Sequence, residues 1–403
     1  MDGNSISSRV ALTLDLPPSC IQFCPAYPDH FVVGTYNLEK EEATQDPGAD
    51  QSDDQETSNT SKKPQSRNGS LLVFMIHDDT LNLVQTVVQP SAILDIRFHP
   101  SPDHGDLLAA ASSTGSLALF RLDPTKDAIS PLKHIATSRC DDLPSDVLFL
   151  QCNWHPTIAN LIAVTTSTGL GRVLTLDSQW MINNASELDV QNDLEAWCIA
   201  FSPSTRWNES DAPVSVYCGG DDSILRYASY TWHLDESNPT IEMLHGPVVI
   251  RGQHEAGVTA ILPLPFLVAG GGRAVVTGSY DEHIRVFLIH DLQTSYGAKR
   301  LQLVADEGLG GGVWRLDLIE CRASDDGSVK VHVLASCMHA GARAVEIVGD
   351  RDGQWSCRVL GRFEEHKSMN YGSDFARPVL GGRVRCVSTS FYDKLLCLWD
   401  CEL

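Results

Sequence analysis

A short strand unit recurs along this chain and limits the possible folds more than any other feature. Each copy alternates apolar and polar residues and ends in a proline, and the copies lie at 21–25, 96–100, 152–156 and 199–203. Alternation with a period of two is typical of a β-strand, and proline cannot donate to the ladder of a sheet. Spacings of roughly fifty residues between the later copies indicate a repeat architecture built from one supersecondary unit.

A second pattern follows these units: a strand of small residues, a tight turn, and a strand of aromatic or aliphatic residues. Its copies lie at 107–118, 216–227, 275–287 and 387–400, and the last copy ends in Trp399-Asp400. A Gly-x-His sequence, from Gly252 to His254, precedes the third copy. These features resemble the WD-repeat β-propeller. No segment keeps the 3.6-residue period of a long helix.

The repeat predicts an all-β fold, a single seven-bladed WD-repeat β-propeller domain over residues 1–403. The last unit is too short for a blade of four strands, whereas residues 9–16 form an alternating strand that belongs to no unit. We therefore expect residues 9–16 to pair beside residues 395–400 and close the ring, which removes an exposed sheet edge. The seven units lie near residues 20–88, 92–138, 146–189, 195–253, 256–307, 311–366 and 369–403.

The charge of the chain excludes one class of partner. It has 52 acidic and 30 basic side chains and a formal net charge of −22, so it repels phosphate backbones and favours cationic partners. We therefore expect no nucleic acid partner. Residues 39–68 are rich in Ser, Thr, Gln and Asp and nearly lack apolar side chains, so we expect them to form a disordered acidic insertion in the first blade.

The twelve cysteines are interpreted as reduced and mostly buried in strands. The N-terminal residues lack the basic and apolar parts of a secretory signal, and no apolar run is long enough to span a membrane. We therefore expect a cytoplasmic monomer without membrane association. No C-x-x-C pair is present, so we expect no metal site. The motifs that bind nucleotides, dinucleotides or catalytic zinc are also missing, and we expect no cofactor.

Residues 308–374 gather His, Ser, Cys, Asp, Arg and aromatic side chains at predicted loops. The loop at 308–312 enters the sixth unit, the turn at 337–341 lies at its middle, and the loop at 366–374 leaves it. In a propeller, loops between blades and turns between the middle strands of a blade lie on the same face. We therefore expect these three segments to converge on one rim of the channel.

Within this stretch, three motifs occur in a fixed order: Gly311-Gly312-Val313-Trp314-Arg315, Cys337-Met338-His339, and His366-x-Ser368-Met369-x-Tyr371-x-x-Asp374. They resemble the diphthine methyl ester hydrolase family, WD-repeat proteins of diphthamide biosynthesis that are also called diphthine methyltransferases. The resemblance implies hydrolysis of a methyl ester on the modified histidine of translation elongation factor 2, before the amidation that completes diphthamide. The alternative function is that of a non-catalytic WD-repeat scaffold for a protein complex.

Ester hydrolysis needs a nucleophile, a base and hydrogen-bond donors for the oxyanion. The base is His366 or His339, and the attacking group is Ser368, Cys337 or an activated water. The trimethylammonium group of the implied substrate suits aromatic faces and carboxylates, whereas the backbone of the glycine run from 310 to 312 can approach an oxyanion closely. The predicted catalytic residues are His366, Ser368, Asp374, His339 and Cys337; the predicted substrate-binding residues are Gly311, Gly312, Trp314, Arg315, Trp197 and Tyr371.

Other polar residues are interpreted as structural. His254, Ser279 and Asp281 match the residues that form hydrogen bonds inside a WD-repeat blade, where buried polar groups need partners. We therefore expect His254→Ala to destabilise the fold. For His366→Ala we expect lower activity and a nearly unchanged fold.

Overall fold

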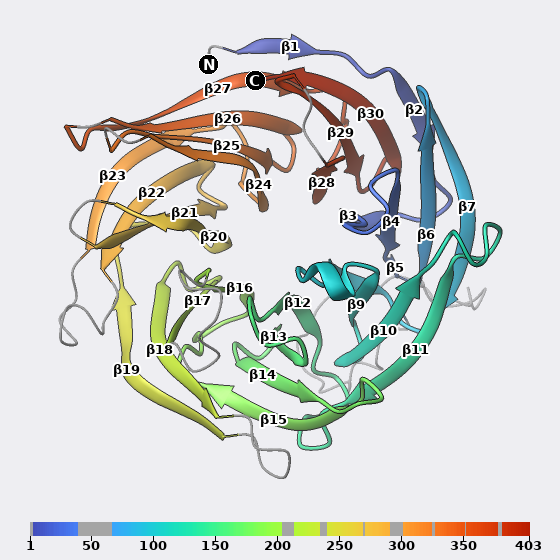
Figure 1. Cartoon of the computed structure of the whole chain (residues 1–403), viewed down its shortest axis with the longest axis horizontal. Coiled ribbons are helices and arrows are strands. Elements are labelled where there is room, and N and C mark those ends of the chain that lie inside the picture. Colours follow the sequence, from blue (N-terminus) through green and yellow to red (C-terminus); the bar gives the residue numbers. More distant parts are fainter. Residues whose placement is uncertain are drawn as a thin grey trace, which may run out of the picture.

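The computed structural model describes residues 3–38, 67–203, 213–233, 240–268, 271–290, 301–324, 327–350, 352–377 and 381–403. Seven β-sheets stand in a ring around a central channel (Figure 1), which confirms the seven-bladed β-propeller. The one helical segment in this part of the chain is a 3-10 turn at Pro102–His104. Among the described residues, therefore, no helix has the length and apolar character to cross a membrane. Most of the predicted acidic insertion, residues 39–66, lies outside the described residues.

In blades 1 to 6 the first strand in the sequence is innermost and the later strands follow outward. Blades 1 to 3 comprise β3 (Pro18–Phe23), β4 (His30–Thr35), β6 (Arg67–His77) and β7 (Thr80–Gln89); β8 (Ile93–Phe98), β9 (Leu107–Ser112), β10 (Ser116–Leu122) and β11 (Leu132–Arg139); and β12 (Phe149–Trp154), β13 (Leu161–Thr166), β14 (Gly171–Leu176) and β15 (Ile182–Leu188). A two-residue strand, β5 (Asn37–Leu38), also pairs with β6.

Blades 4 to 7 repeat this arrangement, and the innermost strand of each runs away from the same end of the channel. We call that end the mouth. The strands are β16 (Ala196–Phe201), β17 (Val214–Gly220), β18 (Leu225–His233) and β19 (Thr240–Ile250); β20 (Val258–Leu267), β21 (Gly272–Ser279), β22 (His283–His290) and β23 (Leu301–Gly308); β24 (Arg315–Ala323), β25 (Val329–Ser336), β26 (Ala342–Gly349) and β27 (Trp355–Phe363); and β28 (Gly372–Phe375), β29 (Arg383–Ser390) and β30 (Leu395–Glu402).

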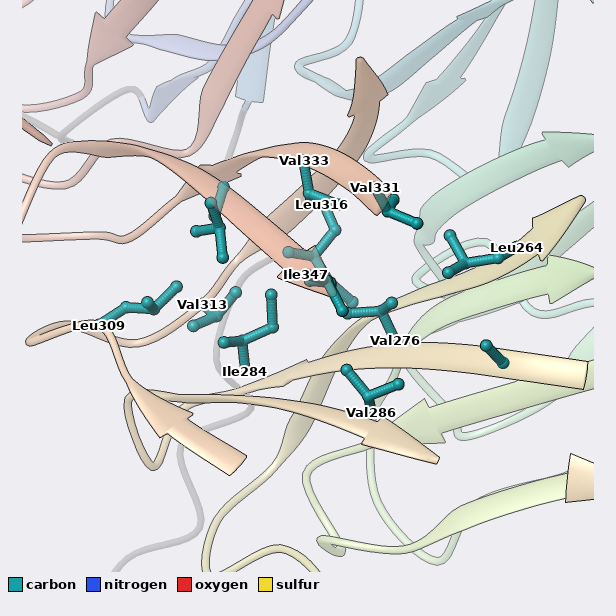
Figure 2. Close-up of a cluster of buried hydrophobic side chains, with 14 of the residues drawn as sticks. Leu264, Val276, Ile284, Val286, Leu309, Val313, Leu316, Val331, Val333 and Ile347 are labelled. Atoms are coloured by element: carbon teal, nitrogen blue, oxygen red, sulfur yellow. The ribbon is translucent and has the colours of Figure 1, made fainter. Parts of the chain in front are cut away.

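The hydrophobic core lies mainly between neighbouring blades. Figure 2 shows the cluster between blades 5 and 6, where Val276 and Val286 face Val331 and Ile347. All four side chains are fully buried, and burial of a valine or isoleucine contributes about 1.5–3 kcal/mol. The alternation along each strand thus directs apolar side chains toward both neighbouring sheets, which explains why the small and β-branched residues of the second and third strands recur in every unit.

Side-chain oxygens of the innermost strands link several blades to the next blade. Each accepts a hydrogen bond from a backbone N–H of the neighbouring innermost strand, at distances of 2.5–3.1 Å. The pairs are Asp374 with Phe23, Gln22 with Phe98, Asp95 with Cys152, and Gln151 with Ile199. These bonds hold the blades 7, 1, 2, 3 and 4 at a fixed spacing around the channel.

An N-terminal strand closes the ring, as the sequence predicts. The strand β2 (Val10–Thr13) pairs antiparallel with β30, from Leu395 to Leu398, and becomes the outer strand of blade 7 (Figure 1). Leu14, which follows it, is buried in the cluster that blade 7 shares with blade 1. The closure therefore combines strand pairing with apolar burial.

The same N-terminal segment also contacts the two neighbouring blades, which was not predicted. A short strand, β1 (Asn4–Ile6), adds a fifth strand to blade 6 by pairing in parallel with β27. Arg9 lies 2.8 Å from Asp79 in the turn between β6 and β7 of blade 1 and also pairs with Asp400 on β30. The first fourteen residues therefore connect blades 6, 7 and 1.

Two histidines occupy equivalent places in blades 5 and 7. His254 Nε2 lies 2.9 Å from Thr277 Oγ1, whereas His366 Nε2 lies 2.8 Å from Ser388 Oγ, which also accepts a hydrogen bond from the Trp399 indole at 2.9 Å. The partner of His254 is thus Thr277, whereas the Ser279 hydroxyl donates to the Ala256 carbonyl. His366 therefore has the blade-stabilising position that we expected of His254.

The residues that follow the two histidines also form equivalent hydrogen bonds. The backbone N–H of Glu255 donates to Asp281, and that of Lys367 donates to Asp393. The two carboxylates sit in the turn between the second and third strands of their blades, as the sequence predicts for Asp281. Each histidine thus belongs to a set of hydrogen bonds that joins the linker between two blades to the middle of the following blade.

The closure can be tested by truncation. Deleting residues 1–16 should lower the midpoint of thermal unfolding by several degrees, because the loss of Val10, Leu12 and Leu14 removes about 3–5 kcal/mol of burial and exposes the β30 edge. Deleting residues 1–7 removes β1 but leaves β2, so this matched truncation should have a smaller effect. Equal midpoints for the full chain and the longer truncation would contradict the closure.

The two histidines should respond alike to substitution. Both His254→Ala and His366→Ala should lower the free energy of unfolding by about 1–3 kcal/mol, because each leaves buried hydrogen-bonding groups without a partner. His77, whose side chain is 75% exposed, provides a control, since His77→Ala should leave stability unchanged. Denaturant titration checks this expectation, and a wild-type unfolding curve for His366→Ala would rule out the equivalence.

Buried histidines also predict a pH dependence of stability. Burial lowers the pKa of His99, His254 and His366 to about 4, and that of His155 to about 3. The folded protein keeps these imidazoles neutral, whereas the unfolded chain protonates them below about pH 6.5. Stability should therefore fall between pH 7 and pH 5, by about 2 kcal/mol for each histidine at most. The decrease should be smaller in His366→Ala than in the wild type; an equal decrease would contradict the assignment.

Candidate functional site

The three segments that the sequence places on one rim do meet there. Met338 and Asn370 form an isolated antiparallel bridge, and the Asn370 N–H donates to the Met338 carbonyl at 2.9 Å. A Cβ atom added to Gly311 would lie 2.3 Å from the Cys337 carbonyl oxygen. The glycine run, the 337–341 turn and the loop before β28 are therefore in direct contact at the mouth.

Aromatic side chains form a continuous arc around this part of the mouth. Trp314 is its centre, with ring centroids 5.3 Å from Trp197, 5.9 Å from Tyr280 and 5.0 Å from Tyr371. The arc continues from Tyr371 to Phe391 at 5.5 Å and from Phe391 to Tyr36 at 6.2 Å. All six side chains are partly exposed. This aromatic arc, comprising Tyr36, Trp197, Tyr280, Trp314, Tyr371 and Phe391, extends from blade 4 through blade 7 to blade 1.

Two glycines make room for the arc. A Cβ atom at Gly312 would lie 2.6 Å from the Met338 sulfur and 3.4 Å from Tyr280. A Cβ atom at Gly257 would lie 2.9 Å from both the Asp221 carboxylate and the Tyr280 ring. Distances under 3.0 Å are too short for side-chain carbons. The structure therefore gives Gly312 and Gly257 a packing role, as it does Gly311 beside Cys337, because each allows close approach of protein groups.

A carboxylate accompanies the aromatic arc. The Trp197 indole N–H donates to Asp221 at 2.5 Å. Burial, together with the neighbouring charges of Glu195 and Asp222, raises the pKa of Asp221, although the indole hydrogen bond opposes the shift. Burial also raises the pKa of Tyr371, so its hydroxyl group is neutral. A half-buried carboxylate beside several aromatic faces is an arrangement that attracts organic cations.

His339 is the exposed imidazole of the site. Its side chain is 58% exposed, and Nε2 lies 4.0 Å from Glu282 Oε1 in the corresponding turn of blade 5. Met338, the preceding residue, has a φ of 43°, which is in the left-handed region of backbone conformations. The turn thus directs His339 toward solvent at the rim, where it is accessible to a bound molecule.

The other predicted catalytic residues lie in different settings. The His366 side chain is buried and forms a hydrogen bond within blade 7. Cys337 is fully buried, and burial raises the pKa of its thiol to about 12, so the thiol stays protonated. Ser368 bonds to Ser390 and to Asp393, at 2.8 Å and 2.7 Å. Within the described part of the chain, no hydrogen bond joins His366, Ser368 and Asp374 to one another. The structure therefore does not assemble them as a catalytic group.

Arg315 and Asp374 lie inside the channel, below the mouth. Arg315 is 2.8 Å from Asp95 on the opposite side of the ring. Asp374 accepts the Phe23 N–H at 2.7 Å and is 98% buried. Of the predicted substrate-binding side chains, Trp197, Trp314 and Tyr371 are thus together at the mouth, whereas Arg315 is not part of the aromatic arc.

The sequence interpretation missed four residues of the site. Tyr36, Asp221, Tyr280 and Phe391 each directly follow the second strand of a blade, namely β4, β17, β21 and β29. Aligning the repeats on this position would have identified them, because the same position holds serine in blades 2 and 3 and cysteine in blade 6. The described residues contain no cluster of three or more His, Cys, Asp or Glu side chains suited to a metal ion.

Comparisons with known proteins point to one group of relatives. No family model matches the chain. It is 29% identical to "Diphthine methyltransferase" of Schizosaccharomyces pombe, over 96% of this chain and 95% of the relative. Proteins of the same name from Mus musculus and Homo sapiens are 27% and 26% identical; the alignments cover 91% and 94% of this chain and 69% and 77% of the relatives.

The comparison of structures supports the fold. The crystal structure of Sqt1 from Chaetomium thermophilum matches with a TM-score of 0.57 and 14% sequence identity, over 95% of this chain and 83% of that one. At this identity the likeness concerns the fold alone. The alignments with the curated relatives cover more than nine tenths of this chain. The chain is therefore a homologue of the proteins named diphthine methyltransferase.

Proposed function

We propose that this chain hydrolyses the methyl ester of diphthine methyl ester on the modified histidine of translation elongation factor 2, giving diphthine for the final amidation to diphthamide. The observation that carries the proposal is the aromatic arc with Asp221 at the mouth. The names of the relatives support it, because they connect this group of proteins with a methyl group on diphthine.

The aromatic arc suits the trimethylammonium group of that substrate. A quaternary ammonium cannot donate hydrogen bonds, so it is recognised by aromatic faces and by nearby negative charge. Trp314, Trp197 and Tyr280 supply the faces, and Asp221 supplies the charge. Because the ester carbon is attached to the carbon that bears the ammonium group, cation binding in the arc holds the ester at the same rim.

His339 is the proposed general base. Imidazole side chains exchange protons near neutral pH, and the exposed ring of His339 is open to water and to a bound ester. Water attacks the ester carbonyl carbon while the imidazole takes its proton. Collapse of the tetrahedral intermediate then breaks the bond to the methoxy oxygen, which receives that proton and leaves as methanol. Glu282, 4.0 Å away, stabilises the transient imidazolium.

The charge of the chain fits a cationic region of a protein substrate. With a net charge of −22, the chain attracts such a region at long range and accelerates the encounter. We further propose that the protein acts as a monomer in the cytoplasm and needs no cofactor. A scaffold function would use the same face for binding only, so turnover of the ester distinguishes the two functions.

Incubation of the purified chain with methyl-esterified elongation factor 2 tests the reaction. Mass spectrometry should show the loss of one methylene mass from the modified histidine, with release of methanol. Cells that lack the protein should accumulate the methyl ester. Normal diphthamide in those cells would contradict the proposal, and binding without turnover would support the scaffold.

Two substitutions separate binding from chemistry. His339→Ala should lower kcat by about 10²–10⁴ with unchanged stability, because a general base typically contributes that factor and an exposed side chain fills no core. Trp314→Ala should mainly raise KM, by about tenfold, since it removes a central aromatic face. His77→Ala is the matched control for His339. Full activity of His339→Ala would disprove its assignment as the base while leaving the binding site to be judged by Trp314→Ala.

A further inference from the structure

Two ion contacts cross the channel below the mouth. Arg315 on β24 of blade 6 lies 2.8 Å from Asp95 on β8 of blade 2, and Arg97 on β8 lies 3.7 Å from Asp317 on β24. Blades 2 and 6 are on opposite sides of the ring (Figure 1). The four side chains therefore connect blades 2 and 6 across the channel.

A cavity of about 290 Å³ adjoins these contacts. Arg97, Arg315 and Asp317 line it, together with the aromatic side chains of Trp154 and Trp314. Its lining includes Pro100 and Pro203, which follow the far ends of β8 and β16. The cavity thus extends toward the face opposite the mouth, and it has room for a small organic molecule.

The charged groups of this cavity are incompletely paired. Arg97 contacts Asp95 at 3.6 Å through Nε and Asp317 at 3.7 Å through Nη1, both too long for hydrogen bonds, so Nε has no hydrogen-bond partner among the described residues. Arg315 donates a hydrogen bond to Asp95, yet its buried Nε also has no hydrogen-bond partner in the part of the chain that the structure describes. Asp317 makes no side-chain hydrogen bond within the described residues. Buried donors and acceptors normally have partners, so a bound molecule has both free donors and a free acceptor to satisfy.

The balance of charge limits what can bind. Arg97 and Arg315 are matched by Asp95 and Asp317, so a simple anion or cation would bring an uncompensated charge into a largely buried site. A zwitterion has no net charge, so it brings no uncompensated charge into the site. Its carboxylate can accept from the guanidinium of Arg97 and from Nε of Arg315, while its ammonium group faces Asp317.

We propose that this cavity binds a small zwitterion that carries an amino or quaternary ammonium group beside a carboxylate. The cavity shares Trp314 with the aromatic arc but extends toward the opposite face, and the proposal does not rest on ester hydrolysis at the mouth. The guanidinium groups select the carboxylate through charge-assisted hydrogen bonds, whereas the indole rings of Trp154 and Trp314 cover the apolar part of the ligand.

Binding should depend on pH through Asp317. Burial and the nearby charge of Asp374 together raise the pKa of Asp317 to about 6, although Arg97, Arg315 and Arg377 act in the opposite direction. The ammonium group needs the ionised carboxylate. Affinity should therefore be constant above about pH 7 and decrease as the pH falls through 6, by at most tenfold per pH unit.

Calorimetric titration of the full chain with glycine, glycine betaine, acetate and tetramethylammonium tests the proposal. At least one of the two zwitterions should bind with a Kd below about 10 mM, and acetate should bind about tenfold more weakly or not at all. Tetramethylammonium is a probe of the aromatic arc, and it should leave the indole N–H resonance of Trp154 in the cavity unshifted. Arg97→Gln and Asp317→Asn should each weaken zwitterion binding by tenfold or more, and Asp317→Asn should also remove the pH dependence. His77→Ala, at an exposed position outside the cavity lining, is the matched control and should leave the Kd unchanged.

A second measurement does not depend on the folding of these variants. In the wild-type protein, added zwitterion should shift the indole N–H resonance of Trp154, which lines the cavity and is not part of the aromatic arc. The absence of zwitterion binding, equal affinity for acetate, or shifts confined to Trp197 would each overturn the proposal. A chain that binds the zwitterion but does not hydrolyse the ester would contradict only the proposed function, and the reverse result would contradict only this inference.

Discussion

The pairing of β2 with β30 is the contact on which the rest of the ring depends. It gives blade 7 its fourth strand and, through Arg9 and Leu14, connects that blade to blade 1. The aromatic arc crosses this same boundary, because Phe391 belongs to blade 7 and Tyr36 to blade 1, with ring centroids 6.2 Å apart. The closure therefore positions part of the candidate site as well as the sheets, and the hydrogen bond from the Phe23 N–H to Asp374 fixes the same boundary at the channel.

The fold was predictable from sequence because its determinants are local. Alternation specifies each strand, the proline turns mark the ends of inner strands, and an unassigned strand beside a short last unit specifies the closure. The parallel pairing of β1 was not predictable in this way, since its three residues carry no pattern and their partners on β27 lie more than 350 residues away. Local sequence likewise did not distinguish Thr277 from Ser279 as the partner of His254. Only the register of the blade decides between them.

The location of the candidate site was predictable from the sequence, whereas the roles of its individual residues were less predictable. Propeller topology brings the segments around Gly311, Met338 and Asn370 together, whatever their side chains. The role of each residue depends on the register of the strands in its blade. His254 and His366 lie 23 and 22 residues before their hydroxyl partners, a common spacing that places both inside a blade. The motif resemblance drew attention to His366, whereas the aromatic residues after the second strands, such as Tyr280, belong to no motif and become a group only when the ring is closed.

Trp314 contributes both to the aromatic arc at the mouth and to the cavity below it. Its ring is the centre of the aromatic arc, and it also lines the cavity beyond the cross-channel ion pairs. The next residue, Arg315, begins β24 and forms the cross-channel contact with Asp95, so the mouth and the cavity share one short piece of backbone. Any movement of that piece changes both environments. If ligands at both ends distinguish between placements of Trp314, each changes the affinity of the other, and the two changes are by the same factor, because coupling between two binding sites is reciprocal.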